Sequence, residues 1–85
     1  MHFLGGVIAI NLDTFEVFWF ESQKEAACQI GINHSHITQV IKGERHKAGG
    51  YWFTRADENA VEKTRAKFGD EIASEVEKLM GEHLN

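Results

Sequence analysis

The sequence predicts an α+β fold with an N-terminal β-hairpin, a helix-turn-helix pair, a short third strand and a long C-terminal helix. Residues 7–12 and 16–20 are rich in β-branched and aromatic side chains, which is typical of strands. Residues 22–43 contain two apolar patterns with helical spacing. Residues 56–83 carry a longer apolar stripe of the same kind. With 85 residues and 42% hydrophobic content, the chain is expected to form a single domain over residues 1–85.

The hairpin is predicted from the two strand-like segments and the turn between them. The first segment ends at Asp13 and Thr14, residue types that are common in turns. The second contains Val17 and three aromatic residues. Because an isolated hairpin is only marginally stable in water, we expect it to pack against other elements.

Capping residues predict where the next two helices begin and end. Ser22 and Glu25 have the spacing of a capping box, which marks a helix start. Gly31 suits the left-handed conformation that ends a helix, and Asn33 is a favourable N-cap for the second one. Gly43 ends that second helix.

These two helices have the spacing of a helix-turn-helix unit. Ala27 is a small residue where the helices would cross, Gly31 lies four positions later, and Ile32 would fill the corner. Ile37 and Val40 would hold the second helix against the first. The outer face of the second helix can then enter the major groove, where polar side chains bond base edges. The side chains predicted to face bases are His34, Ser35, Thr38 and Gln39.

Charge is distributed unevenly along the chain, whose net charge is −4. That total is a poor match for a DNA-binding protein, which usually has a basic face. However, residues 22–55 carry five Lys and Arg against two acids, whereas residues 56–85 carry eight acids against four bases. An ordinary solvated surface also accounts for so small a basic excess. The side chains predicted to contact phosphates are Lys24, Lys42, Arg45 and Lys47.

The C-terminal part leaves two structural choices open. Residues 51–53 form a strand that either joins the hairpin or packs over the helices. The last helix runs to about residue 83 and is either kinked or restarted at residues 69–70, where Gly is followed by Asp. Its stripe either folds back on the hairpin or pairs with a second chain. We favour the homodimer, since dimeric helix-turn-helix proteins read two half-sites.

Several motifs of residues 7–53 occur in the order of a known family. They are Val7-Ile8-Ala9-Ile10-Asn11-Leu12-Asp13, Phe20-Glu21-Ser22, Glu25-Ala26-Ala27, Gly31-Ile32-Asn33, Ile37-Thr38-Gln39-Val40-Ile41-Lys42-Gly43 and Ala48-Gly49-Gly50-Tyr51-Trp52-Phe53. In this order they resemble the nuclease-associated modular DNA-binding domain, also called the intron-encoded nuclease repeat. That module is found appended to homing endonucleases, often from phages, and helps to anchor the enzyme on DNA.

The resemblance implies a double-stranded DNA partner. Our main hypothesis is a non-catalytic DNA-binding protein that acts as a regulator of a phage or mobile element. Two features depart from the family pattern. Its recognition helix is usually basic, whereas this one contains His34 and His36, and we expect no catalytic domain beside the module. Since histidine side chains gain a proton just below neutral pH, we expect DNA binding to be tighter at about pH 6 than at about pH 8.

The sequence argues against enzymatic and metal chemistry. His34 and His36 would point about 200° apart on a helix, and no Cys pair is available for zinc. Cys28 is expected to be buried in the first helix without a base beside it. The two glycine pairs lack the flanking pattern of a phosphate-binding loop. We therefore expect no catalytic residues, no metal and no cofactor.

A second function class remains open, because the chain is acidic overall. It could be a small protein-interaction module, or an inhibitor of a host protein, that retains the fold. The solitary Cys28 and the lack of a secretory signal predict an intracellular, cytoplasmic protein. No apolar run approaches the ~20 residues that a membrane span needs.

Overall fold

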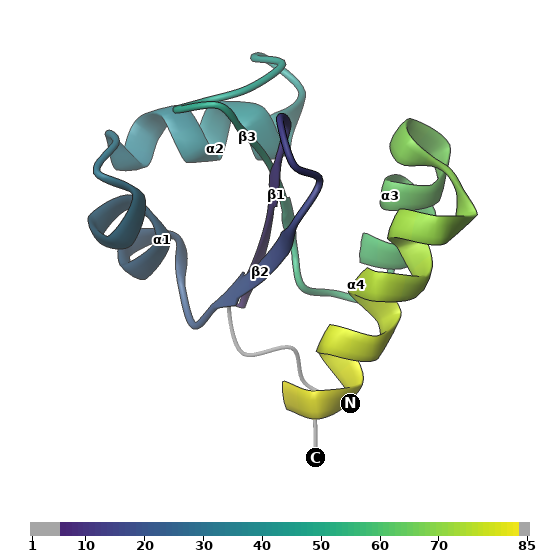
Figure 1. The fold of residues 1–85 in the computed structure, drawn as a ribbon. Helices are drawn as coiled ribbons and strands as arrows, with labels where there is room; N and C mark the ends of the chain where they lie inside the picture. The colour runs from purple at the N-terminus through teal and green to yellow at the C-terminus, as the bar shows by residue number, and fades with distance from the viewer. Residues whose placement is uncertain (1–5, 84–85) are drawn as a thin grey trace.

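A three-stranded antiparallel sheet separates two layers of helices in the computed structural model, which describes residues 6–83 (Figure 1). The strands are β1 (Val7–Asn11), β2 (Val17–Phe20) and β3 (Tyr51–Arg55), in the spatial order β2-β1-β3. Residues 51–53 thus join the hairpin as a third strand, paired with β1. The predicted α+β class and the N-terminal hairpin are confirmed.

The two helical layers cover opposite faces of this sheet (Figure 1). Helices α1 (Gln23–Ile30) and α2 (His34–Lys42) pack on one face. Helices α3 (Ala60–Phe68) and α4 (Asp70–His83) pack on the other. The molecule therefore has three layers, with the predicted helix-turn-helix on one outer side and the acidic C-terminal region on the other.

Strand β1 is central and is covered on both faces. Side chains alternate across a strand, so Val7 and Ala9 face the α1–α2 layer while Ile8 and Ile10 face the α3–α4 layer. All four are at most 1% exposed. This explains why the segment reads as a continuous apolar run and not as an alternation of apolar and polar residues.

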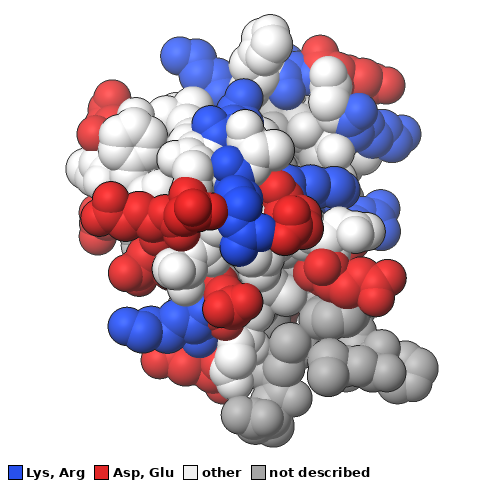
Figure 2. Space-filling view, turned by 90° about the vertical axis from the view of Figure 1, so that its right-hand side faces the viewer, with Lys and Arg blue, Asp and Glu red and all other residues white. Residues whose placement is uncertain are grey.

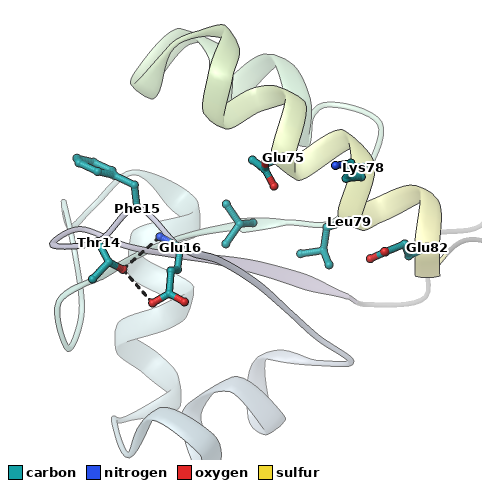
Figure 3. Close-up of a pocket in the computed structure, with 8 residues that line it drawn as sticks. Thr14, Phe15, Glu16, Glu75, Lys78, Leu79 and Glu82 are labelled. Atoms are coloured by element: carbon teal, nitrogen blue, oxygen red, sulfur yellow. Dashed lines mark hydrogen bonds between the residues drawn. The ribbon is translucent and has the colours of Figure 1, made fainter.

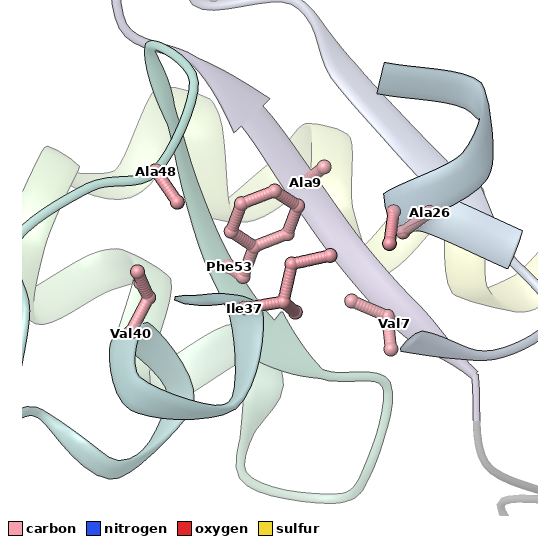
Figure 4. Close-up of a cluster of buried hydrophobic side chains, with 8 residues drawn as sticks. Val7, Ala9, Ala26, Ile37, Val40, Ala48 and Phe53 are labelled. Atoms are coloured by element: carbon pink, nitrogen blue, oxygen red, sulfur yellow. The ribbon is translucent and has the colours of Figure 1, made fainter. Parts of the chain in front are cut away.

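The core beneath α1 and α2 holds these helices against the sheet (Figure 4). Phe53 of β3 and Ile37 of α2 are fully buried at its centre. Deleting a buried side chain of this size typically costs about 2–5 kcal/mol, so α2 is firmly placed. The other buried members are Val7, Ala9, Ala26, Ala27, Val40 and Ala48.

The apolar stripe of the C-terminal region is buried against the sheet of the same chain. Val76 and Met80 of α4 join Ile8 and Ile10 in a second core cluster. The stripe folds back on the hairpin, which was one of the two arrangements predicted, so it no longer argues for a homodimer. The predicted long helix is two helices, because Gly69 (φ 98°, ψ 178°) interrupts it.

The junction between α3 and α4 is held by Arg65. Its Nε donates to Asp70 Oδ1 at 2.7 Å across the break, and its Nη1 bonds Glu62 within α3. The hydrogen bond to Glu62, and then that to Asp70, raises the pKa of Arg65 above its ordinary value. The interruption at Gly69 is therefore an ordered corner that lets α4 pack beside α3.

Candidate nucleic-acid interface

Helix α1 begins and ends where its capping residues predict. Ser22 Oγ accepts a hydrogen bond of 3.0 Å from the Glu25 amide, which satisfies one otherwise unpaired N–H of the first turn. The Glu25 carboxylate accepts from Gln29 Nε2 at 2.9 Å, so it is directed along the helix rather than back to the cap. Gly31 is left-handed, with φ 83°, and its N–H donates to the Ala27 carbonyl at 2.8 Å. The predicted bend at Gly31 is confirmed.

The turn after Gly31 leads directly into α2. Ile32 is half-buried and packs against the core beneath the two helices, as expected of a corner residue. Asn33 Oδ1 accepts hydrogen bonds of 2.9 Å from both the Ser35 amide and the Ser35 hydroxyl. The two helices are thus joined by residues 31–33, each with its own cap, in a helix-turn-helix arrangement.

A glycine turn buttresses this corner, and its position there was not predicted from the sequence. Ala48 and Tyr51 exchange two backbone hydrogen bonds of 2.9 and 3.0 Å around Gly49 and Gly50. Both glycines have positive φ (60° and 82°), as a type I′ turn requires. A Cβ at Gly49 would lie 2.6 Å from Ile32 Cγ2. The contact of Gly49 with Ile32 depends on the tertiary fold.

The outer face of α2 is open to solvent. Ile37 and Val40 are buried beneath the helix. Ser35 and Lys42 are exposed and Gln39 is half-buried between them. Residues spaced by four and three positions lie along one side of a helix, so these three form a polar ridge. Here "polar ridge" denotes Ser35, Gln39 and Lys42, and His34 is exposed at the start of the same helix.

Thr38 connects the two helices instead of pointing freely outward. Its Oγ1 donates to Gln23 Oε1 at 2.7 Å, from the middle of α2 to the first residue of α1, and lies 3.4 Å from the His34 carbonyl. The hydroxyl proton is therefore engaged within the protein, so Thr38 keeps only acceptor capacity for a base. Gln23 was not a predicted site residue, because no local signal links it to a position fifteen residues later.

The four basic side chains predicted to contact phosphates are all exposed: Lys24, Lys42, Arg45 and Lys47. After Gly43 ends α2, the amides of Glu44 and Arg45 donate back to the Gln39 carbonyl at 2.8 and 3.2 Å. Arg45 is therefore held beside the last turn of α2, and its Nε contacts the Lys47 carbonyl at 3.5 Å. This loop adds positive charge next to the polar ridge.

The acidic part of the chain lies away from this surface. The α3–α4 side carries Asp and Glu interspersed with Lys and Arg over the face seen in Figure 2. Because α3 and α4 cover the opposite face of the sheet, their acids do not lie beside α2 (Figure 1). The negative total charge of the chain therefore does not describe the surface around the polar ridge.

Three further expectations concern Cys28, metal ions and membranes. Cys28 is exposed on α1, so the prediction that it is buried was wrong; the buried side of this helix consists of Ala26 and Ala27. Within residues 6–83, no cluster of three or more His, Cys, Asp or Glu side chains could hold a metal ion. Among the same described residues, no helix combines the length and the apolar character needed to cross a membrane.

Comparison with known families gives a match over residues 9–54. The matching family is described as DNA endonuclease I-HmuI-like, NUMOD-like domain. This segment contains most of the sheet together with α1 and α2, and it ends before α3. Comparisons with curated proteins and with solved structures found no match.

Proposed function

The chain belongs to the DNA endonuclease I-HmuI-like, NUMOD-like domain family, and from this premise we propose that it binds double-stranded DNA with α2 as the recognition helix. The observation that carries the proposal is the open polar ridge on α2, fixed at its base by the buried Ile37 and Val40. A helix of this kind fits the major groove of B-DNA. The acids of α3 and α4 lie across the sheet, where they do not oppose phosphate approach.

We assign two kinds of contact to this surface. His34, Ser35 and Gln39 face base edges, and Thr38 contributes as an acceptor while it holds α1 in place. Phosphate contacts fix the orientation of a protein on the duplex without reading its sequence. The side chains that supply them are Lys24, Lys42, Arg45 and Lys47.

The proposed role is binding without cleavage, in a regulator of a phage or mobile element that acts inside the cell, where its DNA lies. The support for a binding role is that the matched family is a domain named for its association with a DNA endonuclease. We propose separately a homodimer through α3 and α4, which would use surface other than the apolar stripe that packs on the sheet of the same chain. Sedimentation of the free protein at increasing concentration tests that part separately.

Binding to a random-sequence DNA duplex at low salt tests the main proposal. Each phosphate neutralised lowers the slope of log K against log[salt] by about 0.9, so four basic contacts predict a slope of about −3.6. If the protein does not bind the duplex at low salt but binds a host protein, the result would support the protein-interaction alternative instead. The same duplex incubated with Mg²⁺ should stay intact, and cleavage products would overturn the non-catalytic part.

A further inference from the structure

A shallow groove lies between the hairpin turn and α4, on the sheet face opposite α1 and α2 (Figure 3). Its volume is about 440 Å³, and it is open to solvent. The lining residues come from residues 14–17 on one side and from α4 on the other. They are Thr14, Phe15, Glu16, Val17, Glu75, Lys78, Leu79 and Glu82.

Apolar and acidic side chains line the groove together. Phe15, Val17 and Leu79 supply apolar surface. Two carboxylates of α4, those of Glu75 and Glu82, border it beside the single ammonium of Lys78, whereas the Glu16 carboxylate points away from α4 (Figure 3). Thr14 Oγ1 donates to Glu16 Oε1 at 3.2 Å and accepts from the Glu16 amide at 3.3 Å.

Phe15 occupies an unusual position at the end of this groove. Among residues 6–83, Phe15 is the one large hydrophobic side chain that is exposed, with a relative accessibility of 48%. Its φ of 62° is left-handed, a conformation that costs an L-residue roughly 1–2 kcal/mol and that Gly or Asn would adopt more easily. Its ring contacts Phe68 edge-on, with 6.1 Å between ring centroids. An exposed aromatic residue held in a strained turn favours a binding role over a purely structural one.

We propose that this groove binds a basic segment of a protein partner, a short run of Lys and Arg side chains around one apolar residue. The apolar residue would pack on Phe15, Val17 and Leu79, while the cations would pair with the carboxylates of Glu75 and Glu82. The excess of acids makes the groove repel phosphates, so nucleic acid is not its ligand. Because the groove and α2 lie on opposite faces of the sheet, one molecule can hold DNA and the partner together.

Fluorescence anisotropy with a dye-labelled peptide tests this inference on the full chain. The probe is a short peptide with one Leu between two runs of Lys and Arg. The double variant Glu75→Gln/Glu82→Gln should weaken peptide binding about fivefold, as expected for two exposed ion pairs. The matched control Glu58→Gln/Glu77→Gln removes the same charge outside the groove and should change it less than about twofold. Equal weakening by both pairs would overturn the proposal.

A second variant tests the apolar contact without the charges. Phe15→Asn keeps a residue that tolerates positive φ, so the midpoint of thermal unfolding should change little. Peptide binding should nevertheless weaken about tenfold, because the apolar anchor loses its aromatic partner. Unchanged peptide binding in this variant, or no binding of the peptide to the parent chain at low salt, would overturn the inference. Duplex binding by all these variants should equal that of the parent chain, so this test fails or succeeds separately from the DNA proposal.

Discussion

The two helical layers share one sheet but differ in charge, in length and in what they expose. The α1–α2 layer consists of two short, capped helices joined by residues 31–33, and the basic excess of the chain lies in and beside it. The α3–α4 layer is acidic and lies outside the family match. Strand β1 is buried by both layers, so they are coupled through the core while their outer surfaces stay separate. A net charge of −4 is thus compatible with a basic face, since the basic excess in and beside α1 and α2 and the acidic excess of α3 and α4 lie on opposite sides of the sheet.

The largest expected effect comes from removing the cations of the α1–α2 layer. The triple variant Lys42→Ala/Arg45→Ala/Lys47→Ala should flatten the salt slope of duplex binding by about 2.7, because three phosphate contacts are lost. The matched triple variant changes the charge equally in the other layer: Lys63→Ala/Lys67→Ala/Lys78→Ala. Anisotropy titrations across a salt series compare the two. If both triple variants lose the same affinity, the layers do not differ in function.

Two glycines provide a stability comparison between the layers. Gly49→Ala should destabilise the fold by about 1–3 kcal/mol, since a Cβ at positive φ meets Ile32. Gly81→Ala in α4 adds a Cβ in a helix, with nothing within 4 Å, and should stabilise the fold by about 0.5–1 kcal/mol. Urea unfolding of both variants gives the two free energies. A neutral Gly49→Ala variant would contradict the close packing of the glycine turn on the corner.

Gln39 tests base reading separately from phosphate binding. After a preferred duplex has been selected from a random pool, Gln39→Ala should lower affinity for it about tenfold, as loss of a bidentate adenine contact would. Affinity for random duplex should change little. Gln29→Ala on α1 is the matched control, because the Gln29 amide bonds Glu25 within its own helix. Equal losses on both duplexes would show that Gln39 does not read sequence.

Local signals in the sequence determined most of the secondary structure. The caps at Ser22 and Asn33 and the left-handed glycines at residues 31 and 43 act over a few residues, so they could be predicted without the fold. The strand pattern and the order of the motifs also indicated the family that matches residues 9–54. The exposed side of α2 followed from helical spacing, because Ile37 and Val40 fix which face is buried.

Only the tertiary structure decided where the C-terminal helices lie and which surfaces they leave open. The hydrophobic effect depends on the apolar area buried and not on the partner that buries it. The sequence pattern of α4 is therefore equally compatible with packing on the sheet and with packing on a second chain. The contact of Gly49 with Ile32, the bond from Thr38 to Gln23 and the exposure of Cys28 depend on segments far apart in the chain meeting. Helix spacing and caps are local, whereas the separation of charge by the sheet is a property of the assembled layers.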